Sequence, residues 1–199
     1  MSWAGDESLP STSALARLRA LLLDGGGLLA TLLGPVPEPG AEGTGKGDVA
    51  GDAGGIGGPA AIAASGPRAE GRRAEYELLV EAIYEGYLLH YGAPRVLLAP
   101  EADLGLLAGD RLYAIGLARL VALGDTEAVA ELADTITLSA LAHGADSPEL
   151  AGAVWEAGAR AVGWGASERH ARAKEMVLTG DPGALEAMRT SAEPVPASR

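Results

Sequence analysis

Carboxylates at four-residue spacing are the side chains of this chain best placed to do chemistry. Glu77, Glu81 and Glu85 fall at i+4 steps, so on a helix they share one edge. Magnesium in proteins is typically held by one or two carboxylates together with phosphate oxygens. Glu81 and Glu85 are therefore candidates for a weak magnesium and phosphate site. The alternative is that they form a solvated helix face that binds nothing.

Other residues that could do chemistry do not form recognisable sites. His90, His143 and His170 lack the i, i+4 spacing of helical metal ligands, and the chain has no cysteine to complete a zinc site. No serine stands in a Gly-x-Ser-x-Gly elbow. Residues 43–47, Gly-Thr-Gly-Lys-Gly, lack the Ser or Thr that follows the lysine of a phosphate-binding loop. We therefore expect no catalytic residues and no metal site outside the carboxylate pair.

Three successive helices would position these carboxylates. From Tyr76 to Tyr87 the apolar side chains recur at i, i+3, i+4 and i+7, which predicts an amphipathic helix. Gly92-Ala93-Pro94 ends that helix, because proline has no amide proton and disfavours the helical conformation before it. Residues 102–123 predict a second helix that is apolar nearly all round, so we expect it in the middle of a bundle. Asp125 suits the N-cap of a third helix.

The helical patterns also predict particular core positions. We expect Leu107, Leu112, Ile115 and Ile136 to be buried. Asp110 lies within the apolar second helix, where an ionised carboxylate is costly unless it is paired or hydrogen-bonded. It is predicted to be a structural polar group of the core, held by a nearby arginine or a helix-end amide and not by a metal.

The centre of the chain resembles a known family. Gly92-Ala93-Pro94 precedes Leu106-Leu107-Ala108-Gly109-Asp110, with 17 residues from Gly92 to Gly109 (109 − 92). This pattern resembles the trans-type polyprenyl diphosphate synthases, in which a Gly-Lys-Pro turn precedes an Ile-Leu-Ala-Gly-Asp helix. The resemblance covers about residues 76–180. It implies an all-α helical bundle like part of the isoprenoid synthase fold.

The chain departs from that family at the charged positions. In the family, a first Asp-Asp-x-x-Asp motif holds the magnesium ions that bridge the diphosphate, and here that window is Glu81-Ala82-Ile83-Tyr84-Glu85. Ala82 replaces a carboxylate, and Ala93 replaces the lysine of the turn. The second aspartate-rich motif is expected beyond the matching segment, where Asp181 is better explained as a helix N-cap. The resemblance therefore implies at most a diphosphate and Mg²⁺ remnant at Glu81 and Glu85.

Composition divides the rest of the chain. Residues 1–33 contain a short amphipathic helix that Ser13 can cap. Residues 34–67 are rich in glycine and proline, with too few large apolar side chains to offset the entropy of ordering, so we expect a disordered linker. Residues 68–190 are predicted to form the helical bundle domain, and residues 191–199 a disordered tail.

Charge and cysteine content narrow the partners and the location. A formal charge of −12 argues against nucleic acid and anionic membrane surfaces, which attract basic patches. Arg68, Arg72 and Arg73 stand before the first bundle helix, where we expect them in solvent. The absence of cysteine excludes disulfides and thiol catalysis. Residues 1–10 lack the basic start of a secretory signal, and the charges within residues 102–123 argue against a transmembrane span. We expect a cytoplasmic protein.

Three functional hypotheses follow. The first is a non-catalytic polyprenyl-synthase-like subunit or regulator of isoprenoid synthesis, with a prenyl synthase chain or a second copy of itself as partner. The second is a residual prenyltransferase that binds a prenyl diphosphate through Glu81, Glu85 and Mg²⁺. The third is an α-helical scaffold or adaptor unrelated to prenyl chemistry. No cofactor is expected, except Mg²⁺ in the second case.

Overall fold

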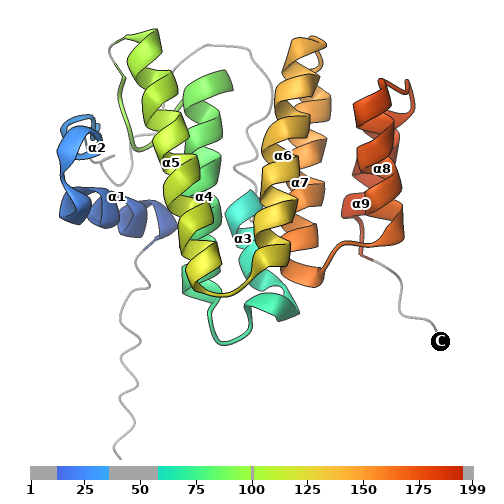
Figure 1. Ribbon diagram of the computed structural model, residues 1–199, viewed down its shortest axis with the longest axis horizontal. Helices are drawn as coiled ribbons and strands as arrows, with labels where there is room; N and C mark the ends of the chain where they lie inside the picture. Colours follow the sequence, from blue (N-terminus) through green and yellow to red (C-terminus); the bar gives the residue numbers. More distant parts are fainter. Residues whose placement is uncertain (1–12, 36–57, 100, 195–199) are drawn as a thin grey trace, which may run out of the picture.

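The computed structural model describes residues 13–35, 58–99 and 101–194, and these residues form an all-α fold (Figure 1). The expected fold class, a helical bundle, is confirmed for them. An isolated antiparallel bridge joins Leu33 to Leu97. None of the helices in this part of the chain combines the length and apolarity needed to cross a membrane. The helical elements are α1 (Ala14–Gly25), α2 (Gly27–Thr31), α3 (Pro59–Ser65), the 3₁₀ turn η1 (Pro67–Ala69), α4 (Arg73–Tyr91), α5 (Ala102–Ala122), α6 (Thr126–Gly144), α7 (Pro148–Trp164), α8 (Glu168–Thr179) and α9 (Ala184–Ala192).

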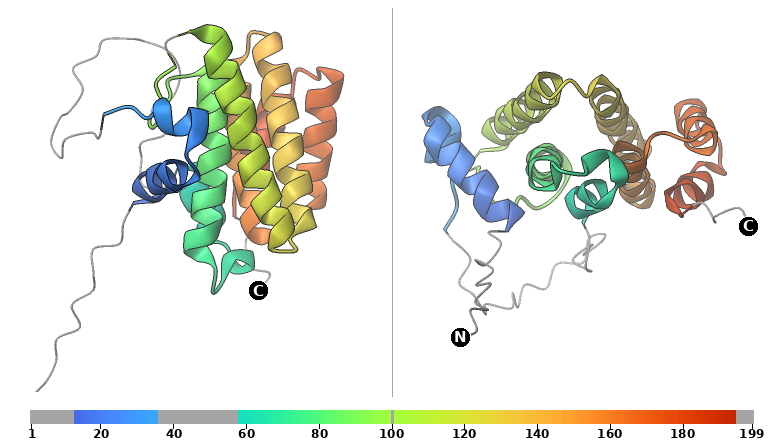
Figure 2. Two further views of the ribbon diagram at one scale, coloured as in Figure 1. Left: turned by 60° about the vertical axis from the view of Figure 1, so that its left-hand side comes forward. Right: turned by 90° about the horizontal axis from the view of Figure 1, so that it is seen from below.

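Helix α4 is the central element of one half of the bundle, with α1, α3 and α5 packed around it (Figure 2). Helix α7 has the same role in the other half, where it contacts α3, α6 and α9. The expectation that residues 102–123 lie in the middle is wrong, because α5 is an outer helix. It buries Leu112, while the predicted core residue Leu107 is 61% exposed. Ile115 and Ile136 are partly buried.

The helix ends follow local side-chain chemistry. Asp125 caps α6 by accepting a hydrogen bond from the amide of Ala128 at 3.0 Å, as expected. Ser13 caps α1 in the same way, through the amide of Ala16. Helix α8 is preceded by the N-cap residue Ser167 and followed by the C-cap residue Gly180, whose φ of 67° is the left-handed conformation that glycine adopts without strain.

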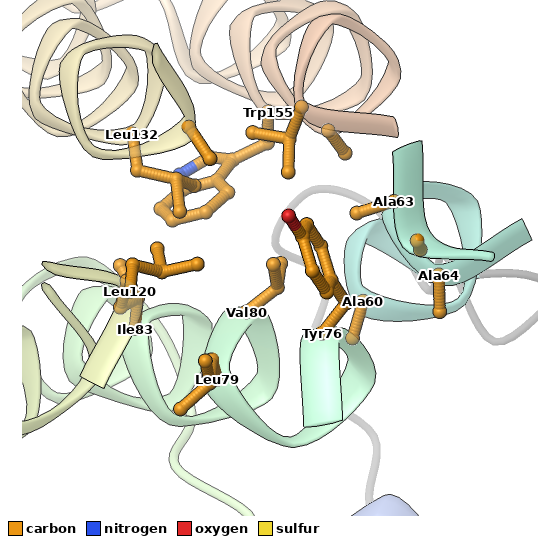
Figure 3. Close-up of a cluster of buried hydrophobic side chains, with 14 of the residues drawn as sticks. Ala60, Ala63, Ala64, Tyr76, Leu79, Val80, Ile83, Leu120, Leu132 and Trp155 are labelled. Atoms are coloured by element: carbon orange, nitrogen blue, oxygen red, sulfur yellow. The ribbon is translucent and has the colours of Figure 1, made fainter. Parts of the chain in front are cut away.

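The largest core cluster joins the two halves. Tyr76, Val80 and Ile83 of α4 face Leu132 of α6 and Trp155 of α7 (Figure 3). Burying side chains of this size stabilises the fold by roughly 1.5–3 kcal/mol each. Trp155 is 2% exposed and also contacts the ring of Tyr84 edge-on, at 5.0 Å between centroids. The bundle is therefore held by a few large side chains of α4, α6 and α7 in an otherwise small-residue core.

The expected linker, residues 34–67, is wrong at its C-terminal end. Helix α3 lies there and buries Ala60, Ala63 and Ala64 against α4 and α7. Its packing depends on glycine: a Cβ added at Gly163 would lie 2.6 Å from the carbonyl oxygen of Ala63, and one added at Gly66 would clash with the backbone of Gly163. The small residues of α3 and α7 thus allow the backbones of these two helices to pack in close contact. Residues 36–57 of that linker lie outside the described residues.

The N-terminal segment packs on the bundle. Leu18 and Leu22 of α1 are buried in one cluster with Leu112. The Arg17 guanidinium reaches Glu77 of α4 at 2.5 Å. Of the predicted tail, residues 191 and 192 end α9, and residues 195–199 lie outside the described residues.

Candidate functional site

The predicted carboxylate pair lies on α4 and is buried. Glu81 is 8% exposed and Glu85 is fully buried, so the expectation of a solvated carboxylate face is wrong for both. They are buried because the segment after α4 turns back along the end of that helix. The turn begins at Gly92, the C-cap residue, and brings Arg95 over the pair. Tertiary structure, and not helical periodicity, decides which face of α4 is exposed to solvent.

The carboxylate of Glu85 binds backbone amides of the segment that follows α4. One carboxylate oxygen accepts hydrogen bonds from the amides of Arg95, Val96 and Leu97, at 2.7, 2.6 and 3.2 Å. The other oxygen lies 3.4 Å from Nε of Arg95 and accepts no hydrogen bond. Leu97 in turn forms the bridge to Leu33. Glu85 therefore links α4 to the loop that anchors the N-terminal helices.

Arg95 is the residue of this cluster that sequence reasoning missed. Its guanidinium forms an ion pair with Glu81 and lies over the ring of Tyr84, 5.1 Å from the centroid. Burial raises the pKa of Glu81, and the charge and hydrogen bond of Arg95 offset that effect only in part. The sequence signal is an arginine directly after the Gly92-Ala93-Pro94 turn, where a reversed chain runs back past the preceding helix.

A magnesium ion at this pair would have to displace Arg95. The guanidinium already lies against both carboxylates, and one Glu85 oxygen is surrounded by amide donors. In the described part of the chain, no three His, Cys, Asp or Glu side chains gather closely enough to hold a metal ion. Ala93 of the turn is exposed. The arrangement is thus suited to holding a loop against a helix, and the residual diphosphate site stays a prediction.

Asp110 is a correction. It was expected in the polar core, but its side chain is 68% exposed, at an edge of α5 beside His90 of α4. Its carboxylate lies 3.2 Å from Nε2 of His90, and not beside an arginine or a helix-end amide. The cause is composition: the outer face of α5 carries alanine and leucine, so apolar content alone misrepresents which side is buried.

A second polar cluster joins the start of α4 to the start of α6. Arg68 contacts Asp125 at 2.8 Å and Glu127 at 2.6 Å, and the hydroxyl of Tyr76 donates to Asp125. Burial first, and then the contact with Asp125, raises the pKa of Tyr76 to about 12. The expectation of solvated arginines is therefore wrong for Arg68. Arg72 donates to the carbonyl oxygen of Leu123 beside it. A cavity of about 440 Å³ lies among these groups.

A third cluster joins α6, α8 and α9. His170 is 3% exposed and lies 3.2 Å from Glu131 and 3.2 Å from the hydroxyl of Ser191. Lys174 contacts Glu131 at 2.9 Å and Asp134 at 2.7 Å. Burial raises the pKa of Glu131, but the hydrogen bonds and charges of His170 and Lys174 outweigh it, so the pKa is lowered.

The contacts from Ser191 to His170 and from His170 to Glu131 follow the order of a hydrolase triad. The serine hydroxyl, however, already donates a hydrogen bond elsewhere. It donates to the carbonyl oxygen of Met188 at 2.8 Å, one turn earlier in α9. This is a common local bond of serine in helices. These hydrogen bonds therefore connect three helices, and Ser191 is not a free nucleophile.

Fold and site together define an all-α bundle whose prominent carboxylates are paired with basic side chains of the same chain. Comparison of the sequence with family models and with curated proteins, and of the structure with solved structures, finds no significant match.

Proposed function

We propose that this chain is a polyprenyl-synthase-like protein that transfers no prenyl group itself and acts as a subunit or regulator of polyprenyl diphosphate synthesis. The family part of the proposal rests on the resemblance of residues 92–94 and 106–110 to the turn and helix of those synthases. The all-α bundle is compatible with that resemblance. The observation that carries the non-catalytic part is the pairing of Arg95 with Glu81 and Glu85.

The chemical argument concerns the leaving group. Ionising a prenyl diphosphate requires the charge of the departing diphosphate to be neutralised, and metal ions held by carboxylates supply that charge in the family. In this chain the carboxylates at the corresponding positions are committed to an internal cation and to three loop amides. They stabilise the fold. The contribution to prenyl synthesis would then be made by contact with a catalytic partner chain.

The first test is activity of the isolated chain. Labelled isopentenyl diphosphate, allylic primers of several lengths and Mg²⁺ are supplied, and elongated products are measured. We expect none. Metal-dependent turnover that disappears in Glu81→Gln would replace this proposal with the residual-enzyme hypothesis.

The second test is the partner. The tagged chain is used to recover binding proteins from its own cells, and a full-length prenyl synthase is sought by mass spectrometry. We then expect the purified synthase to change its rate or product length when the chain is added. A synthase that is neither recovered nor altered would leave the helical scaffold as the better description.

A further inference from the structure

We propose that the cavity where α7 ends, α8 begins and α9 ends binds a small organic anion, a phosphate or carboxylate that carries an apolar group. The cavity has a volume of about 450 Å³, within the range of roughly 300–1,000 Å³ typical of small-molecule sites. It is separate from Glu81 and Glu85, and the proposal does not depend on a role in prenyl synthesis.

Arg160 of α7 is the first anion-binding group. Its guanidinium lies over the indole of Trp164, 4.3 Å from the ring centroid. In residues 13–35, 58–99 and 101–194 it forms no ion pair or hydrogen bond. A guanidinium stacked on an aromatic ring is held in place while its in-plane N–H groups stay available, and their fork matches the two oxygens of a carboxylate or phosphate. The Arg160 guanidinium is therefore held in place by Trp164 but has no carboxylate partner among the described residues.

Arg169 of α8 is the second anion-binding group. Its guanidinium donates to the backbone carbonyl oxygen of Glu193 at 3.2 Å and forms no ion pair within the described ranges. Glu193 also lines the cavity, yet its carboxylate contacts neither arginine closely enough to form an ion pair. Two arginines thus line one cavity with donors unused, in a chain whose formal net charge is −12.

The cavity at the start of α6 provides a comparison, because its arginine is paired with carboxylates. There Arg68 is held by Asp125 and Glu127 at 2.8 and 2.6 Å, so the arginine and its counter-ions lie in one cavity. The two cavities have similar volumes, about 440 and 450 Å³. The cavities differ in that Arg160 and Arg169 form no ion pair with a carboxylate of the described residues. An anion from solution would supply that partner.

The remaining walls define the rest of the ligand. The hydroxyl of Ser191 already donates to the carbonyl oxygen of Met188, and the hydroxyl oxygen of Ser167 accepts from the amide of His170. The other walls include Ala157, Ala161 and the ring of Trp164, which is 38% exposed. We infer an anionic head on the arginines and a compact apolar body against the alanines and the indole.

Calorimetric titration of the full chain tests the proposal with phenyl phosphate, benzoate and phenol. We expect saturable binding of phenyl phosphate or benzoate, and the stronger of the two identifies the head group. Phenol, which has the ring without the charge, should bind at least about tenfold more weakly, because a charge-assisted bidentate contact is lost. Equal affinity for phenol would overturn the assignment, and so would the absence of saturable binding of either anion.

Substitutions locate the site. Arg160→Gln should weaken binding of the anion by roughly tenfold or more. Arg172→Gln is the matched control, because Arg172 is exposed on α8 and does not line the cavity, and its affinity should equal that of the wild type. If Arg160→Gln does not fold, Arg169→Gln takes its place with the same expectation. Equal loss, or no loss, in the cavity variant and the control would overturn the proposal.

Discussion

The carboxylate clusters of α4 and α6 use the same chemistry but differ in the number of basic partners for each glutamate. On α4, Glu81 and Glu85 share the single cation Arg95. On α6, Glu131 is held by both His170 and Lys174. The pKa of Glu81 is raised because burial dominates, whereas the pKa of Glu131 is lowered because its two basic partners outweigh burial. The charge of such a carboxylate is therefore favourable only where its partners outweigh the cost of burial. Partly buried Glu131, with two basic partners, meets that condition, and the more deeply buried Glu81 does not.

The two clusters also differ in what they connect. Glu85 binds backbone amides of the loop directly after its own helix, so its contacts fix a local chain reversal. Glu131 contacts side chains from a helix about forty residues later, with a separation of 43 to Lys174. The α4 cluster thus positions a loop, and the α6 cluster fastens one helix to another. Substitutions in each should reveal these separate roles.

The largest effect is expected from Glu85→Ala. It leaves three loop amides without their buried acceptor, which should lower the free energy of unfolding by roughly 3–5 kcal/mol. Urea unfolding followed by circular dichroism measures this. Glu156→Ala, at an exposed position of α7, is the control and should stay within about 0.5 kcal/mol of the wild type. A loss for Glu85→Ala as small as that of the control would show that the loop is held by other contacts.

Glu131→Ala should have the next largest effect. Lys174 keeps Asp134 as a partner, but His170 loses the acceptor on one ring nitrogen. We expect a loss of about 2–3 kcal/mol, since hydrogen bonds to charged groups contribute roughly 1.5–3 kcal/mol. The same unfolding measurement applies. Asp134→Ala is a useful companion because Asp134 is exposed, and it should cost about 1 kcal/mol or less. If the two variants are equally stable, burial adds nothing to this cluster.

Glu81→Gln should have the smallest effect among the substitutions of Glu85, Glu131 and Glu81. The charge of Glu81 is disfavoured by burial, and an amide oxygen can still accept from Arg95, so we expect a loss of about 1 kcal/mol or less. Urea unfolding near neutral pH checks the value. A loss as large as that of Glu85→Ala would mean that the Arg95 contact contributes much more than the direction of the pKa shift indicates.

The dependence on pH should separate the clusters most finely. Because the pKa of Glu81 is raised above its usual 4.5, its contribution is fully present below that value and is lost as the pH rises through the folded-state pKa. Because the pKa of Glu131 is lowered, its contribution is present above 4.5 and is lost as the pH falls through the folded-state pKa. The stability cost of Glu81→Gln should therefore shrink toward neutral pH, and the cost of Glu131→Gln should grow. Unfolding free energies from about pH 7 down to about pH 3 test both; parallel profiles would contradict the comparison.

The sequence predicts those features of the fold that are local. Periodicity predicts α4, α5 and α6, and Asp125 and Ser13 cap helices as expected, because a cap needs only amides within a few residues. Leu112 is buried as expected. The burial of α3 is not local. Its alanines match the composition of a linker, and their packing depends on the approach of Gly163 from a distant helix.

The candidate site was harder to predict for the same reason. The spacing of Glu81 and Glu85 indicates that they share a helix edge, but not that a loop covers it. Arg95 has no periodic relation to either, because its contact depends on how the chain reverses after Gly92. Asp110 shows the converse: an apolar helix suggested burial, but Asp110 lies at an exposed edge of α5 beside His90.

The central claim is that Arg95 and the loop amides, and not a metal ion, are the partners of Glu81 and Glu85. Calorimetric titration of the full chain with Mg²⁺ and pyrophosphate tests it most directly. Arg160→Gln is included to weaken any binding of pyrophosphate in the α7–α9 cavity. We predict no Mg²⁺-dependent binding of pyrophosphate in Arg160→Gln. Saturable, Mg²⁺-dependent binding that survives in Arg160→Gln and is lost when Glu81→Gln is added would contradict the account.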